Sequence, residues 1–121
     1  MIAQPTAQEA TEVLTPFYEL DAKQVTRMVT IQQQRINNLE AIQPLLQTDY
    51  YTYLAKRRNI ERNTLESIER MLRGEQLETI RQQRIRIRKH ESDIIRTLRR
   101  QGKTNEQIEM AIAEADYRGI E

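Results

Sequence analysis

"YELDAKQVTRM", residues 18–28, decides the fold because it marks the start of a long helix. The Asp21 carboxylate is placed to accept hydrogen bonds from the free backbone N–H groups of a first helical turn. Gln24, three residues later, is placed to reach back to the cap residue as in a capping box. The stretch therefore predicts a helix that begins at about Ala22.

Apolar residues continue three or four apart along the rest of the chain, interrupted at Pro44 and at Gly74. A second capping box, Thr104 with Gln107, precedes a short final segment. The predicted helices span about residues 22–43, 45–73, 75–100 and part of 105–119. We therefore predict an all-α fold of three to four helices, in which the first two long helices form an antiparallel hairpin through the Pro44 turn.

The composition fits one domain of long, solvent-exposed helices. The chain has 121 residues, of which 38% are hydrophobic, 5% aromatic and 31% charged. Residues 1–12 are small and polar, so we expect a flexible N-terminal segment followed by a single helical domain over residues 13–121. The middle of the second helix is polar apart from Ile60. Its apolar seam is therefore thin, and we expect homodimerisation to complete it.

The third predicted helix carries an interrupted seven-residue repeat. Arg84 and Glu91 occupy seam positions between apolar residues. The apolar members of this repeat are Leu77, Ile80, Ile87, Ile94 and Leu98. Ile85 and Ile87 lie about 200° apart around a helix, which favours a helix contacted on two sides.

Positive charge is concentrated in residues 81–103, although the net charge of the chain is only +1. We predict that a binding partner contacts this segment. The candidate partner-binding residues are Arg81, Arg84, Arg86, Arg88, Lys89 and Arg96. The partner is a protein in one interpretation. In the alternative, the chain is a small helical nucleic-acid-binding or phage-type accessory protein that uses residues 81–103.

Several classes of chemistry have no supporting motif. The chain has no cysteine, no Gly-rich phosphate loop and one histidine, His90, for which a solvated surface position is favoured over a metal ligand. Neither Ser67 nor Ser92 lies in a nucleophile context. We predict no enzymatic activity, cofactor or metal. No apolar run approaches the roughly 20 residues of a membrane span, and the first residues do not resemble a signal peptide, so we expect a soluble protein without membrane insertion.

A short pattern occurs twice, as "LDAKQ" in residues 20–24 and "LRGEQ" in residues 72–76. Each copy has a leucine, a glutamine four residues later and a hydrophobic residue directly after the glutamine. The chain thereby resembles, over about residues 14–100, the Spy/CpxP family of bacterial periplasmic stress proteins. The hallmark of that family is a twice-occurring Leu-Thr-x-x-Gln motif in a small all-helical chain. The threonine is replaced by Asp21 in the first copy and by Arg73 in the second.

The resemblance implies a chaperone-like stress-response protein that binds unfolded or partner proteins without ATP, on the mixed cationic and apolar surface of an antiparallel, cradle-shaped homodimer. It assigns a structural role, fixing helix starts and turns, to Leu20, Gln24, Leu72 and Gln76, and Asp21 is able to replace threonine as a cap. It also implies a periplasmic location if a signal peptide has been removed. Otherwise we expect a cytoplasmic location.

Overall fold

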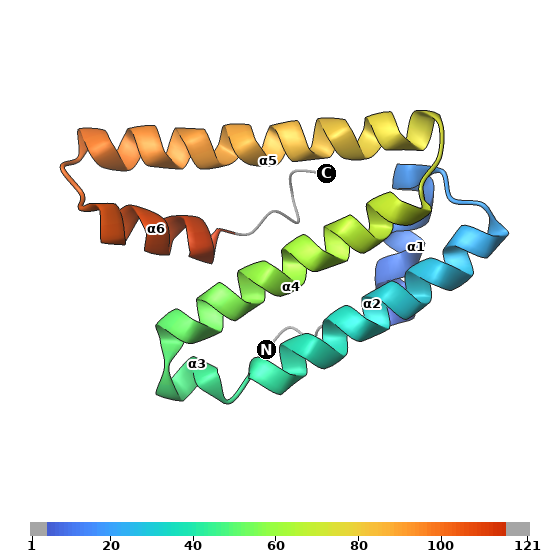
Figure 1. The fold of residues 1–121 in the computed structure, drawn as a ribbon, viewed down its shortest axis with the longest axis horizontal. Coiled ribbons are helices and arrows are strands. Elements are labelled where there is room, and N and C mark those ends of the chain that lie inside the picture. The colour runs from blue at the N-terminus through green and yellow to red at the C-terminus, as the bar shows by residue number, and fades with distance from the viewer. Residues whose placement is uncertain (1–4, 116–121) are drawn as a thin grey trace.

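The computed structural model describes residues 5–115, and this part of the chain contains helices and no strand. The helices are α1 (Ala7–Tyr18), α2 (Ala22–Ile42), α3 (Leu45–Thr48), α4 (Tyr50–Met71), α5 (Glu75–Arg100) and α6 (Asn105–Glu114). The all-α prediction is confirmed, and α2 and α4 form the predicted antiparallel hairpin (Figure 1). None of these helices is both long and apolar enough to cross a bilayer.

The second predicted helix, residues 45–73, is divided by Asp49. The Asp49 carboxylate accepts hydrogen bonds from the backbone N–H of Thr52 at 3.2 Å and from the Thr52 hydroxyl at 2.7 Å. Such a side chain offers the backbone an alternative to a continuous helix. The chain therefore makes the single turn α3 and then starts again as α4.

The N-terminal helix α1 precedes the first helix that the sequence predicts. Thr6 and Glu9 form a capping box, with Thr6 Oγ1 accepting from the Glu9 N–H at 3.1 Å and the Thr6 N–H donating to Glu9 Oε1 at 3.2 Å. Ala7 and Thr11 are buried, and the Thr11 hydroxyl donates to the Ala7 carbonyl at 2.7 Å. We expected residues 1–12 to be flexible, but from Ala7 onward they are helical. The small side chains of Ala7 and Thr11 allow α1 to pack closely against the rest of the chain. Residues 1–4 and, at the other end, residues 116–121 of the predicted domain lie outside the described residues.

The main core lies where α1, α2, α4 and the start of α5 meet, at the right-hand end of Figure 1. Its buried residues are Tyr18, Met28, Ile31, Ile68, Leu72 and Ile80. Five partly buried residues pack against them, namely Leu14, Phe17, Leu20, Leu65 and Met71. The core thus gathers one end of each of these four helices.

From Gly74 the helices α4 and α5 diverge, and α6 folds back between their far ends (Figure 1). Ile108 anchors α6 as its buried residue, and the Arg57 guanidinium donates to the Ala113 carbonyl at 2.7 Å. The buried residues of α4 are Leu54 and Ile68 alone, so its middle is thinly packed, as its polar sequence predicts.

The interrupted repeat of α5 is explained by ion pairs with α4. Arg84 pairs with Glu69 at 3.4 Å, and Glu91 pairs with Arg58 at 3.5 Å. The sequence places Leu77 in the apolar seam of α5, but this prediction is wrong because the residue is 43% exposed. A straight helix drifts by about 20° every seven residues relative to an exact heptad, so three repeats rotate Leu77 out of the seam.

Replacing Ile80 with alanine should lower the free energy of unfolding by about 2–5 kcal/mol, because Ile80 is fully buried and its removal leaves a cavity. Leu77→Ala on the same helix is the control, and it should change stability by less than about 1 kcal/mol because Leu77 is substantially exposed. Urea denaturation followed by circular dichroism measures both. Equal losses in the two variants would contradict this placement of the core.

Candidate functional site

The two copies of the repeated motif lie side by side and are joined through their glutamines. Gln24 Nε2 donates to Gln76 Oε1 at 2.9 Å, and Gln76 Nε2 donates to Gln24 Oε1 at 2.8 Å. We call this reciprocal contact, between residues 52 positions apart, the glutamine pair. Each amide supplies both a donor and an acceptor, which is why two glutamines can complement each other.

Each glutamine also fixes the start of its own helix. Gln24 Oε1 accepts from the Asp21 N–H at 3.0 Å while Asp21 Oδ1 accepts from the Gln24 N–H at 2.8 Å, which completes the predicted capping box. At the start of α5, Gln76 Oε1 accepts from the Arg73 N–H at 3.0 Å. At α2 both hydrogen bonds of the capping box are made. At α5 only the glutamine bond is made, because the N-cap residue Gly74 has no side chain that could accept the second one.

The glutamine pair further contacts the ends of the two preceding helices. Gln24 Nε2 donates to the Met71 carbonyl at 2.9 Å, and Gln76 Nε2 donates to the Tyr18 and Glu19 carbonyls at 3.1 and 3.0 Å. Carbonyls at a helix C-terminus have no partner within the helix. The two side chains therefore join the C-terminal ends of α1 and α4 to the N-terminal ends of α2 and α5.

The leucines of the motif lie beneath this junction. Leu72 is buried in the core, and Leu20 is half-buried against it. Tyr18, the last residue of α1, donates its hydroxyl hydrogen to Gln83 Oε1 and so also links α1 to α5. The role of Tyr18 and Gln83 has no counterpart in the repeated pattern, so inspection of the motif alone could not find it.

The second residues of the two copies, Asp21 and Arg73, contact each other. Arg73 donates through Nη2 to Asp21 Oδ2 at 3.0 Å. The Gln24 backbone N–H is the main cause of the lowered pKa of Asp21, and the Arg73 guanidinium adds to it. Sequence analysis missed this ion pair, although the opposite charges at equivalent positions of the two copies were the signal for it.

Three of the six predicted partner-binding residues are engaged in ion pairs. Arg81 contacts Glu78 at 2.8 Å and lowers the pKa of Glu78 to about 2. Arg84 lies in the seam of α5 and pairs with Glu69 of α4 at 3.4 Å. Arg96 contacts Asp93 at 3.6 Å. These cations are partly neutralised before any partner arrives.

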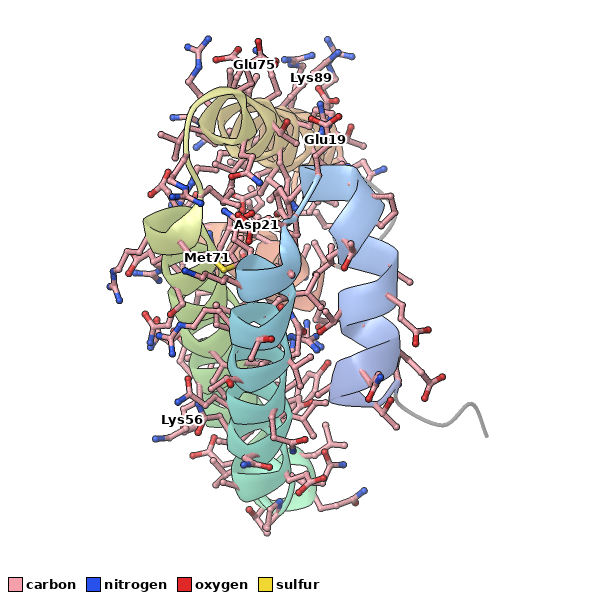
Figure 2. The ribbon with its side chains drawn as sticks, turned by 90° about the vertical axis from the view of Figure 1, so that its right-hand side faces the viewer. Glu19, Asp21, Lys56, Met71, Glu75 and Lys89 are labelled. Carbon is pink, nitrogen blue, oxygen red and sulfur yellow. The ribbon has the colours of Figure 1, made fainter. Side chains whose placement is uncertain are left out.

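The other three candidates do not share one face of α5. Consecutive residues lie about 100° apart on a helix, so Arg88 and Lys89 face different directions. Lys89 points away from the body of the protein (Figure 2), and neither it nor Arg88 forms an ion pair within residues 5–115. Arg86 lines a shallow surface pocket together with Glu19, Glu75 and Glu78. The structure thus distributes the six candidates around the helix.

Within residues 5–115, no group of three or more His, Cys, Asp or Glu side chains is arranged to hold a metal ion. His90 is exposed on α5. Comparison of the chain with protein-family models, curated proteins and solved structures yielded no match.

Gln24→Ala and Gln76→Ala should each lower the free energy of unfolding by about 1–3 kcal/mol, because each leaves partly buried polar groups of the junction without partners. The double variant should cost less than the sum of the single variants, with a coupling of about 0.5–3 kcal/mol. Urea denaturation of the four proteins measures this cycle. Gln33→Ala is the control because Gln33 is exposed and bonds to Asn37 of its own helix. Strictly additive losses would contradict the glutamine pair.

Asp21→Asn should remove one pH-dependent contribution to stability while retaining a side-chain oxygen that can cap α2. Because the pKa of Asp21 is lowered in the folded state, its stabilisation is present above the unfolded pKa of about 3.9 and is lost as pH falls through the folded pKa. The difference in Tm between wild type and variant should therefore be constant near neutrality and shrink below about pH 4. Circular dichroism melts across this range measure it, and a pH-independent difference would be the contrary result.

Proposed function

We propose that this chain is a non-enzymatic protein-binding module, acting as a chaperone or as a regulator of a partner protein in the manner of Spy/CpxP proteins. The glutamine pair carries the proposal. The two copies of the motif complement each other, because Gln24 and Gln76 exchange hydrogen bonds. This mutual contact explains why the motif occurs twice in one chain. The replaced threonines support the same interpretation, because Asp21 and Arg73 form a complementary pair.

The surface of α5 supports protein binding rather than catalysis. Leu77 and Ile85 are large apolar residues with exposed fractions of 43% and 40%, and arginines lie around them. Apolar residues that remain exposed on a small protein are suited to contact apolar segments of another protein. The surrounding arginines favour segments that also carry acidic residues.

Nucleic-acid binding through residues 81–103 is the competing function. Phosphate contacts depend on available cations. Arg81, Arg84 and Arg96 already have carboxylate partners, so a polyanion would have to displace Glu78, Glu69 and Asp93. This arrangement favours the protein partner.

The proposal includes an antiparallel homodimer, and a periplasmic location in the case that a signal peptide directs the chain there. The physical reason for the dimer is the thin packing of α4 and the half-buried seam of α5. Light scattering over the micromolar range should give twice the chain mass. A monomer at all concentrations with a full cooperative melt would remove the dimer from the proposal.

Reduced, carboxymethylated α-lactalbumin, an acidic and permanently unfolded protein, is a suitable test partner. Titration calorimetry at physiological salt should detect saturable binding, whereas short duplex DNA under the same conditions should bind poorly. The proposal fails if α-lactalbumin is not bound and the DNA complex is tight and weakens steeply as salt rises.

A further inference from the structure

One flank of α5 carries a continuous line of residues that are exposed, apart from the half-buried Ile95. The members of this α5 stripe are spaced three or four apart and so share one side of the helix. They are Leu77, Arg81, Ile85, Arg88, Ser92, Ile95 and Arg99. The stripe extends over 23 residues, from Leu77 to Arg99, which is about 33 Å at a rise of 1.5 Å per residue.

The α5 stripe is distinct from the seam by which α5 packs on the rest of the chain. The seam contains the fully buried Ile80 and the two residues that form ion pairs with α4, Arg84 and Glu91. Ile85 belongs to the stripe and is 40% exposed, whereas Ile87 belongs to the seam and is half-buried. The sequence predicts a helix contacted on two sides, and within residues 5–115 only the seam side is covered.

The cations of the stripe are Arg81, Arg88 and Arg99. Arg81 donates to both carboxylate oxygens of Glu78. Arg88 and Arg99 form no ion pair with another described residue. Near Arg99 the surface forms a shallow depression lined by Ser92, Ile95, Arg96, Arg99 and Arg100. The stripe therefore combines apolar side chains with two available guanidinium groups, those of Arg88 and Arg99.

We propose that the α5 stripe binds an acidic amphipathic helix of a partner protein, which lies lengthwise along α5. This proposal rests on the proposed function and specifies the chemistry of the partner. Apolar residues of the partner contact Leu77, Ile85 and Ile95, and its carboxylates pair with Arg88 and Arg99.

The spacing of the stripe argues for a helical partner. Contact positions that repeat every three to four residues over about six turns match a second helix packed at a small crossing angle. A helix bound in this way presents anchor residues at the same spacing. Duplex DNA would use the arginines but would leave Leu77 and Ile85 exposed to water, so the observed alternation favours a protein helix.

The test uses a labelled synthetic helix of the same length as the stripe, with leucines three and four residues apart and glutamates beside them. A scrambled peptide of identical composition lacks that spacing. Fluorescence anisotropy at physiological salt should show that the full-length protein binds the ordered peptide at least tenfold more tightly than the scrambled one. Arg88→Glu/Arg99→Glu should weaken binding at least tenfold, and Ile85→Ser should weaken it independently.

Lys23→Glu/Lys56→Glu is the matched control. It makes the same change in net charge at exposed lysines of α2 and α4 (Lys56 is labelled in Figure 2), away from the stripe. Its affinity for the ordered peptide should stay within twofold of wild type. Far-UV circular dichroism verifies that each variant is helical, and Ile85→Ser tests the stripe without any change of charge.

Three outcomes would overturn the inference: no binding of the ordered peptide by wild type, equal affinity for the scrambled peptide, or equal weakening in the control variant. Tighter binding of short duplex DNA, lost in Arg88→Glu/Arg99→Glu, would assign the stripe to nucleic acid instead. If wild type and Arg88→Glu/Arg99→Glu bind α-lactalbumin equally, the proposed function stands and the α5 stripe is not its site. If wild type binds neither α-lactalbumin nor the peptide, both proposals fail.

Discussion

The reciprocal hydrogen bonds between Gln24 and Gln76 join four helix ends at one point, and the rest of the arrangement depends on them. Each helix terminus leaves backbone groups without partners, and burial of such groups is costly unless a side chain satisfies them. At this junction two amides bond to N–H groups of two helix starts and to carbonyls of two helix ends. The main core, with Leu72 among its buried residues, lies directly beneath.

Away from this junction the apolar packing between helices becomes progressively sparser. The helices α4 and α5 diverge from Gly74, so ion pairs such as Arg58 with Glu91 replace apolar contacts between them, and α6 fills the wide end (Figure 1). Exposed ion pairs contribute little to stability. The fold is therefore anchored at one end, while α5 extends as a long helix with one side against the body and a neighbouring flank exposed. Such a helix is well placed to present side chains to another protein.

The proposed function depends on two parts of the chain with different roles. The repeated motif fixes the positions of α2 and α5, and the side chains of α5 that the seam does not use alternate between cationic and apolar residues. A rigid helix that presents such a line requires little reorganisation to bind a complementary helix, and preorganisation lowers the entropic cost of binding. The same residues 81–103 that the sequence marks as basic are thus separated by the fold into paired cations and available cations.

The sequence by itself determined the all-helical class, the starts of α2 and α6, the bounds of α5 and the break at Gly74, because capping and chain breaks are local interactions between residues a few positions apart. Local signals at Thr6 and Asp49 were also present but were missed among small and polar residues. Only the tertiary structure decided that Gln24 contacts Gln76, that Arg73 contacts Asp21, and that Arg84 pairs with Glu69 while Arg88 is available. These contacts join residues far apart in the chain, and a periodic pattern fixes which residues share a helix face but not which face meets another helix.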